Sequence, residues 1–334
     1  YEISACLVGS EMCIRDSIKI TQNNKRIMIR GRIMKKNALT QVRTDLALEA
    51  KNNISKDNDA IKGVRITEEK DCSNNINVVK MEVLNRTGAN AIKRPVGTYI
   101  TMEVPALMED DEGSHREISK ALADELRKLI MASYSWDNRI PKVLVVGLGN
   151  REATSDALGP EVVSNLFITR HIVEFMGYDE VEGAFAVTSA IVPGVMAQTG
   201  MDTCEIISGI IRKTKPDILI AVDALAARGI KRLNSTIQIT DTGIHPGSGV
   251  GNNRQAITKK SMGIPVIAIG VPTVVDASTL IYDSVKRNNV EDPVQISDEY
   301  KLMYVTSKDI DAIIKRVSYT ISEGINICMG FDRR

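Results

Sequence analysis

The sequence predicts an α/β fold, specifically a three-layer α/β/α sandwich with a mostly parallel central sheet. The unbroken apolar runs at Lys142–Gly147 and Asp217–Val222 are typical of strands that are buried on both faces. Downstream of the first run, strand-like segments alternate with loops and segments of helical periodicity. This alternation favours parallel strands covered by helices on both sides.

The individual elements follow from the same patterns. The expected strands of the central sheet are Lys142–Gly147, Gly183–Val187, Asp217–Val222, Thr236–Ile239 and Pro265–Gly270. The expected helices are His115–Tyr134, Gly159–His171, Thr203–Thr214 and Ser307–Ile325. In the first of these helices, a single apolar stripe is formed by Ile118, Leu122, Leu126 and Ile130.

The region before the central sheet is organised differently. Residues 34–75 are polar and rich in turn-forming residues, so we expect an extended or partly flexible arm. Ile76–Val83 and Gly97–Val104 alternate between apolar and polar side chains, as strands with one exposed face do. They predict a small accessory β element around residues 76–104.

The N-terminus carries signs of non-native sequence. Residues 1–17 resemble translated sequencing-adapter read-through, and we expect them to be an artefact. Residues 18–36 contain seven Lys or Arg and no acid, which is compatible with a nucleic-acid-binding arm or a targeting helix. Arg30-Gly31-Arg32 can also be written entirely in purine codons, like a ribosome-binding site. We therefore expect residues 18–33 to be untranslated upstream sequence, with Met34 as the natural start and Met28 as the second choice.

Composition excludes several classes of protein. The chain has 43 basic and 42 acidic residues, which gives no sign of a general polyanion binder, and we expect no direct nucleic-acid partner. No apolar stretch approaches the roughly 18 residues that span a bilayer, and no secretory signal precedes Met34. These observations predict a cytoplasmic protein without a membrane partner. Beyond residues 1–17 the cysteines are Cys72, Cys204 and Cys328. Because their number is odd and they form no Cys-x-x-Cys pair, the sequence supports neither a disulfide framework nor a structural zinc site.

Two aspartates, Asp156 and Asp223, follow the two unbroken apolar runs at Lys142–Gly147 and Asp217–Val222. The carboxyl ends of parallel strands meet at one edge of a sheet, so we expect both carboxylates there. Two carboxylates removed from bulk water do not both ionise easily, so one keeps a proton while the other polarises a water or binds a metal. For either residue alone a structural role is an equal alternative: a helix N-cap for Asp156 and a buried, paired side chain for Asp223.

Several glycine-rich motifs are weaker signals. Gly147-Leu-Gly-Asn-Arg-Glu152 begins like a dinucleotide-binding fingerprint, but Glu152 replaces the third glycine and would repel a pyrophosphate. Gly247–Gly251 could hold an anion on backbone amides, although no Gly-Lys-Ser/Thr follows, and a tightly turning loop is the alternative. Asp241-Thr-Gly243 matches the aspartic-protease triplet only once, among strands expected to be parallel, and we interpret it as a chance match.

The three histidines are His115, His171 and His245. The first two fall in polar or helical segments, where a solvated histidine is the ordinary interpretation. His245 lies in a glycine-rich loop after an expected strand, and it could bind a metal, act as an acid or base, or bond to the backbone. No Gly-x-Ser-x-Gly elbow accompanies it, which disfavours a Ser or Cys hydrolase.

Four longer segments carry a family resemblance. They are Gly147–Pro160, Ala190–Met201, Val222–Arg228 and Thr242–Asn252. From about Val42 onward the chain closely resembles the germination proteases of spore-forming bacteria. The resemblance implies an endopeptidase that degrades small acid-soluble spore proteins in the forespore and spore core, a homotetramer, and a fold similar to that of hydrogenase maturation endopeptidases.

The resemblance also assigns residues. The two essential aspartates of the family fall on Asp156 and Asp223. Family members are made as zymogens and lose a short propeptide at an acidic-hydrophobic-Ala site, which matches Asp45-Leu46-Ala47. The expected propeptide is 34–45 and the catalytic domain 46–334. Substrates of the family carry a further acid at P4, where this chain has Val42, and this departure suits a weaker site that the protein processes itself.

The mechanism has three alternatives at this stage. We favour Asp156 and Asp223 as an acid/base pair acting on water, without a metal or other cofactor. In the related hydrogenase maturation enzymes the matching carboxylates contact a metal together with a histidine, so a divalent metal held by Asp156, Asp223 and His245 is the second alternative. The third, from another class, is a non-enzymatic module that binds an anion on its glycine loops.

Overall fold

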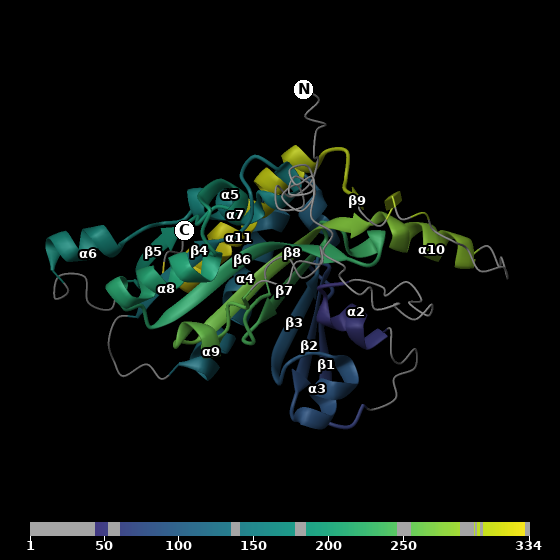
Figure 1. Ribbon diagram of the computed structural model, residues 1–334, viewed down its shortest axis with the longest axis horizontal. Coiled ribbons are helices and arrows are strands. Elements are labelled where there is room, and N and C mark those ends of the chain that lie inside the picture. The colour runs from purple at the N-terminus through teal and green to yellow at the C-terminus, as the bar shows by residue number, and fades with distance from the viewer. Residues whose placement is uncertain are drawn as a thin grey trace, which may run out of the picture.

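The computed structural model describes residues 44–52, 61–134, 141–177, 185–245, 255–287, 297, 299–300 and 303–330. The expected artefact 1–17, the expected upstream segment 18–33 and residues 34–43 of the expected propeptide lie outside these ranges. At the centre is a nine-stranded sheet with the strand order β1-β2-β3-β7-β8-β6-β4-β5, and β9 pairs with β8 (Figure 1). The strands are β1 (Val64–Asp71), β2 (Ile76–Val83), β3 (Gly97–Glu103), β4 (Lys142–Gly147), β5 (Val187–Ile191), β6 (Ile218–Ala227), β7 (Thr236–Thr240), β8 (Val266–Asp276) and β9 (Tyr304–Val305).

The helices connect and cover these strands. They are α2 (Ala47–Asn52), α3 (Arg86–Ile92), α4 (Glu112–Ser133), α5 (Leu158–Ser164), α6 (Arg170–Met176), α7 (Met196–Thr199), α8 (Thr203–Thr214), α9 (Lys259–Met262), α10 (Ala277–Arg287) and α11 (Ile310–Cys328). Three short 3-10 turns are η1 (Pro105–Met108), η2 (Thr154–Asp156) and η3 (Ile230–Arg232). No helix in the described part of the chain is both long and apolar enough to cross a membrane.

The sheet is mixed, and the α/β class is confirmed. Strands β5, β4, β6 and β8 run parallel to one another, whereas β1, β2, β3 and β7 continue the same sheet as antiparallel strands. The expected accessory strands are therefore present as β2 and β3, but they join the central sheet through the β3–β7 pair. The expectation that the neighbours of β7 are parallel to it was wrong, because β7 runs antiparallel to both β3 and β8.

Helices cover both faces of the parallel half, which makes the three layers (Figure 1). Within β4, Val143 and Val145 pack into the larger core cluster with side chains of α4, α5 and α11. Leu144 and Val146 point to the other face and pack with side chains of α8 and α9. Because successive side chains of a strand point to opposite faces, a strand covered on both sides must be apolar throughout, as the sequence of β4 is.

Most expected elements occur where the sequence placed them. The bounds Gly183–Val187 were wrong for one strand, because β5 begins only at Val187, and one expected helix is divided. The segment Gly159–His171 forms α5 and the first turn of α6, with a break between them. At this break the Thr169 hydroxyl donates to the Ala186 carbonyl (2.7 Å) and accepts from the Thr188 amide (2.8 Å). These bonds tie Thr169, the N-cap residue of α6, to the chain around β5, and such a long-range contact is not revealed by helical periodicity.

The expected arm 34–75 is more ordered than its composition indicates. Its described part contains α2 and the edge strand β1, which pairs only with β2. Almost every residue of β1 is exposed. An exposed edge strand has no buried face, so it lacks the apolar alternation by which strands are recognised in a sequence.

His115 is buried, and the interpretation of it as a solvated histidine was wrong. Its Nδ1 lies 2.6 Å from the hydroxyl of Thr320 on α11, and its Nε2 lies 2.8 Å from the carbonyl oxygen of Glu109. The ring therefore joins the start of α4 to α11. His171, on α6, is exposed as expected.

We predict that His115→Ala lowers the free energy of unfolding by about 1–3 kcal/mol, because it leaves a cavity and removes the ring's hydrogen bonds to the Thr320 hydroxyl and the Glu109 carbonyl. Urea unfolding followed by circular dichroism measures the change. His171→Ala is the matched control and should change stability by less than about 0.5 kcal/mol. Equal effects of the two substitutions would contradict the bridging role of His115.

Candidate active site

The loop after β4 folds back on itself and fixes Asp156. The Leu148 amide donates to the Val222 carbonyl of β6 (2.8 Å), and the Asn150 amide donates to Asp156 Oδ2 (2.8 Å). Gly149 has φ of +111°, and a Cβ there would lie 2.0 Å from the carbonyl oxygen of Asp156. Only glycine fits this turn, so the Gly-x-Gly signal serves to aim a carboxylate.

A second glycine contact sets how closely α5 approaches the sheet. A Cβ on Gly159 would lie 2.3 Å from the Leu148 carbonyl oxygen and 2.6 Å from that of Val222. The first turn of α5 therefore packs directly on the strand backbones, and Asp156 just before it is held at the sheet edge. The N-cap position of α5 is Ala157, so the interpretation of Asp156 as an N-cap does not apply.

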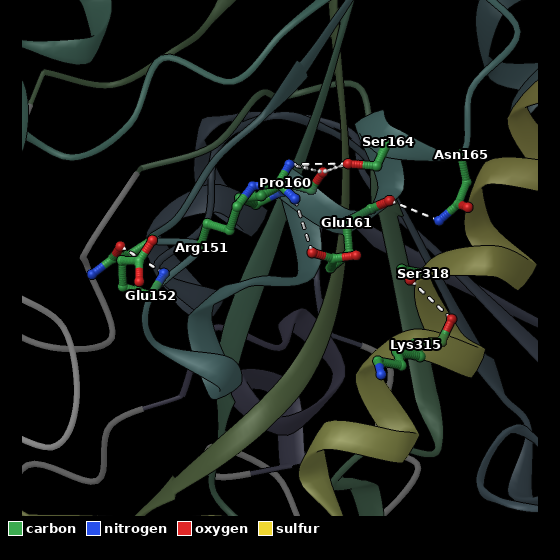
Figure 2. Close-up of polar contacts among 9 residues, drawn as sticks. Arg151, Glu152, Pro160, Glu161, Ser164, Asn165, Lys315 and Ser318 are labelled. Atoms are coloured by element: carbon green, nitrogen blue, oxygen red, sulfur yellow. Dashed lines mark hydrogen bonds and ion pairs between the residues drawn. The ribbon is translucent and has the colours of Figure 1, made fainter.

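Arg151 fastens the same loop to α5. Its Nη1 lies 3.1 Å from Glu161 Oε1, and its Nη2 donates to the Pro160 carbonyl (3.1 Å) and to the Ser164 hydroxyl (3.0 Å). Figure 2 shows these contacts of Arg151 with Pro160, Glu161 and Ser164. The backbone amide of the neighbouring Glu152 donates to the Asn150 side chain (3.0 Å). The Arg151 side chain is half exposed, so its ion pair adds little to the stability of the fold. Its main effect is to orient the loop after β4 relative to α5.

Asp223 lies within β6 and not beyond its end, because β6 continues to Ala227. Its side chain is buried, with 8% of the residue exposed, and Oδ1 accepts from the Ala224 amide (3.0 Å). Within the described residues, no Lys, Arg or His forms an ion pair with Asp223 or Asp156. In the described part of the chain, Asp223 is therefore not a structural residue that is neutralised by a paired cation.

Burial and mutual repulsion set the protonation of this pair. Burial raises the pKa of Asp156 to about 6, although the Asn150 amide opposes the shift. Burial raises the pKa of Asp223 well above its usual range, and the nearby charges of Asp156 and Asp45 raise it further. The more deeply buried Asp223 is therefore the group that more strongly keeps a proton, and Asp156 is the group that ionises more readily, which is the direction of difference that acid/base catalysis by two carboxylates uses.

The segment Thr44–Ala47 lies against the same edge. The Asp45 amide donates to the Ala226 carbonyl (3.0 Å), and the Ala226 amide donates to Asp45 Oδ2 (2.9 Å). Leu46 is fully buried and Ala47 is 1% exposed. Arg94 Nη2 donates to the Thr44 carbonyl (2.9 Å). The acidic-hydrophobic-Ala segment thus lies beside Asp223, and its Ala47 is the first residue of α2.

The chain beyond this peptide is anchored by Glu49 of α2. Its Oε2 accepts from the Arg228 amide (2.8 Å), and its Oε1 lies 3.8 Å from Arg232 Nε. The Thr44 hydroxyl also donates to Glu49. With contacts on both sides of the Asp45–Leu46 bond, this peptide bond is held in one place relative to the two aspartates.

The remaining sequence candidates lie apart from this arrangement. His245 is exposed. Among the described residues no three or more His, Cys, Asp or Glu side chains are grouped so that they could hold a metal ion. The loop Gly247–Gly251 lies outside the described residues. Asp241 accepts from the Thr98 amide (2.8 Å), so it joins the end of β7 to β3.

The thiols of the buried Cys204 and the half-buried Cys328 are poor nucleophiles. Burial raises the pKa of Cys204 to about 11 and that of Cys328 to about 12. Both side chains are therefore protonated at neutral pH, and a thiolate is the reactive form of cysteine. This agrees with the sequence-based argument against a Cys hydrolase.

Sequence reasoning missed three polar residues of the site. Asn150 positions Asp156, Gln198 of α7 donates to the Asn150 side chain (3.0 Å), and Gln238 of β7 contacts the Asp45–Ala47 segment. Gln238 did leave a signal. It lies in the middle of the strand Thr236-Ile-Gln-Ile-Thr240, which is buried throughout. A buried side-chain amide is costly unless it forms hydrogen bonds, so its presence there indicates a polar partner.

The fold and the site together define a class: an α/β sandwich with two carboxyl groups near one edge of its sheet, the half-buried Asp156 and the buried Asp223, whose pKa values are both raised. Comparison with known proteins gives the particular family. The germination protease family model matches residues 41–291, and the chain belongs to this family. It is accordingly a peptidase.

The similarity to individual members extends along most of the chain. The germination protease of Caldanaerobacter subterraneus is 42% identical over 86% of this chain and 94% of its own length. That of Clostridium acetobutylicum is 40% identical over 87% of this chain and 96% of its own length. That of Priestia megaterium is 47% identical over 73% of this chain and 66% of its own. Among solved structures, a NiFe hydrogenase maturation protease from Thermococcus kodakarensis is 17% identical, covers 60% of this chain and 98% of that chain, and has a TM-score of 0.30.

The raised pKa values predict how stability depends on pH. An aspartate whose pKa is higher in the folded than in the unfolded chain stabilises the fold below its unfolded pKa of about 4, and this contribution is lost as pH rises through the folded value. Relative to a variant with Asn at positions 156 and 223, the natural chain should therefore lose about 1–3 kcal/mol of unfolding free energy between pH 4 and 7. Urea unfolding of both proteins across this range measures the difference. A difference that stays constant with pH would contradict the assigned shifts.

Proposed function

We propose that this peptidase is an endopeptidase that begins the degradation of small acid-soluble spore proteins during germination, in the cytoplasm of the spore. The observation that carries the proposal is the peptide Asp45-Leu46-Ala47 resting beside Asp223. Its acidic-hydrophobic-Ala order is the pattern that the family resemblance implies for the substrates. By the same resemblance the protein is a homo-oligomer, with four copies expected.

The same contact supports synthesis as a zymogen. While Thr44–Ala47 occupies the edge of the sheet, a protein substrate cannot lie there. Cleavage of the Asp45–Leu46 bond would remove the propeptide 34–45 and leave the catalytic domain 46–334. Because the backbone and side chain of Asp45 are already hydrogen-bonded to Ala226 of β6, the cleavage can proceed within one chain.

The chemistry follows from the protonation of the pair. Asp156, ionised at neutral pH, takes a proton from a water molecule, and the water oxygen attacks the carbonyl carbon of the scissile bond. Asp223 gives its proton to the departing nitrogen as the carbon–nitrogen bond breaks. The proton on Asp156 then returns to Asp223, which restores the pair.

Substitution of the pair tests this mechanism. We expect Asp156→Asn and Asp223→Asn each to abolish cleavage of a spore protein, with activity at least about 10³-fold lower, because each change removes one member of a proton-transferring unit. The double variant should lose no more than either single variant. Circular dichroism establishes that the variants are folded. Near-normal turnover by either folded variant would show that the pair is assigned wrongly.

The pH profile gives a second test. The rate should fall as pH drops below about 6, because Asp156 then becomes protonated and no longer accepts a proton from water. Cleavage rates measured from pH 4 to 8 on a peptide containing Asp-Leu-Ala would reveal this acid limb. A rate that continues to rise below pH 5 would contradict the role of Asp156 as the base.

Metal dependence separates the two catalytic alternatives. In the two-carboxylate mechanism, exhaustive chelation and His245→Ala should each leave the rate within about twofold, since neither touches the proton-transferring pair. If chelation inactivates the enzyme and His245→Ala reproduces the loss, with partial recovery on adding metal, the metal-dependent alternative with Asp156, Asp223 and His245 replaces it.

Maturation can be tested at the cleavage site itself. Asp45→Lys should block processing, because an ammonium group in this place cannot accept the hydrogen bond from the Ala226 amide and the acidic position of the pattern is lost. N-terminal sequencing of the matured protein should give Leu46. Maturation that begins elsewhere, or full activity in the uncut chain, would overturn the zymogen proposal.

A further inference from the structure

Gln238 lies at the same level of the sheet as Asp223, two strands away. Gln238 of β7 and Asp223 of β6 are both paired with Gly270 of the intervening strand β8. Residues directly opposite one another on neighbouring strands share a face, so the two side chains project from the same side. With neighbouring strands about 4.8 Å apart, their Cα atoms are separated by about 10 Å. This spacing leaves room for an extended peptide between the carboxyl and the amide.

Because Gly270 has no side chain, the side chain of Leu225 can lie over β8 at this point. A Cβ at this position would lie 2.5 Å from the side chain of Leu225, which is itself buried. The absent side chain lets Leu225 fold over β8 and form an apolar floor between Asp223 and Gln238. The neighbours of Gln238 in its strand, Ile237 and Ile239, point into the core on the other face.

The side-chain amide of Gln238 contacts the residues on both sides of Leu46. Its Oε1 accepts from the Ala47 amide (2.6 Å), and its Nε2 lies 3.4 Å from the carbonyl oxygen of Asp45. The first contact fixes the orientation of the side chain, because a backbone N–H can donate only to the oxygen end of the amide. The nitrogen end is thereby directed at the carbonyl group that is expected to be cleaved. Gln238 is 8% exposed, so little water competes for this contact.

We propose that Gln238 is a catalytic residue whose Nε2–H stabilises the oxyanion that forms on the scissile carbonyl. The inference rests on the proposed cleavage of the Asp45–Leu46 bond. At 3.4 Å the contact to the ground-state carbonyl is long, and it shortens when the oxygen becomes negatively charged and the carbon tetrahedral. A donor that binds the oxyanion better than the carbonyl accelerates the reaction, whereas one that binds both equally does not.

Water, Asp156 and Asp223 account for every proton that moves in this reaction. Water attacks the Asp45 carbonyl carbon and its proton passes to Asp156, which leaves the negative charge on the carbonyl oxygen facing Gln238 Nε2. When the intermediate collapses, the carbon–nitrogen bond breaks and Asp223 protonates the Leu46 nitrogen. Gln238 gains and loses no proton. A protein substrate bound in the same way would present its own acidic-hydrophobic-Ala segment to the same amide.

A purely structural role for Gln238 is the competing explanation, in which it only holds the uncut segment in place. Gln238→Glu separates the two roles, because a carboxylate retains the oxygen that accepts from the Ala47 amide and loses the N–H that faces the Asp45 carbonyl. Gln238→Ala removes both. Gln255, which is exposed, supplies matched controls as Gln255→Glu and Gln255→Ala.

The experiment uses the full chain and follows self-cleavage as a first-order process, with the product identified by N-terminal sequencing. Hydrogen exchange at the Ala47 amide, measured by NMR before cleavage begins, reports whether the segment remains docked. We expect Gln238→Glu to cleave about 10²- to 10³-fold more slowly than the natural chain while the Ala47 amide stays protected, as loss of one oxyanion donor does elsewhere. The Gln255 variants should cleave at the natural rate.

Three outcomes would overturn the inference. If Gln238→Glu cleaves at the natural rate, the N–H has no catalytic role. If cleavage in both Gln238 variants slows only in proportion to lost protection of the Ala47 amide, the residue merely docks the segment. If the natural chain does not cut between Asp45 and Leu46, the proposed function fails as well, and this result is recognised before any Gln238 variant is compared.

Discussion

The burial of an unpaired carboxyl group inside the sheet is the constraint on which the site depends. Asp223 stands in β6 between apolar neighbours, and within the described residues no cation compensates it. Such a group avoids the cost of a buried charge by keeping its proton. Asp156, held by a backbone amide, has a pKa of about 6 and therefore ionises more readily. The energetic penalty of burial thus makes two identical side chains differ in how strongly they hold a proton.

The position of Asp156 depends in turn on contacts between backbones. Gly149 and Gly159 allow the loop after β4 and the first turn of α5 to approach atoms that any Cβ would touch. A loop held this closely leaves its carboxylate little freedom, and restricted freedom favours a fixed proton-transfer geometry. The same glycines resemble a nucleotide-binding motif in sequence, but here they serve packing and the orientation of one aspartate.

The antiparallel half of the sheet supplies the other side of the site. Strand β7 brings Gln238 beside β8, and the segment at Asp45 reaches Gln238 across 193 positions of sequence. Neither the amide nor the segment belongs to the parallel strands that bear the aspartates. Joining both halves in one sheet therefore brings the Asp45–Ala47 segment into contact with Gln238 on one side and near Asp223 on the other.

The sequence by itself determined the α/β class and the bounds of β2, β4 and α8, because apolar runs and helical spacing are local consequences of burial. It also proposed Asp156 and Asp223 as the candidate pair, which stays a prediction. It did not determine β1, since an exposed edge strand has no apolar pattern, or the burial of His115, which depends on the hydroxyl of Thr320 far along the chain. Only the tertiary structure decided that β3 and β7 join the central sheet. Their pairing is a long-range match of backbone hydrogen bonds, which side-chain patterns within either strand do not encode.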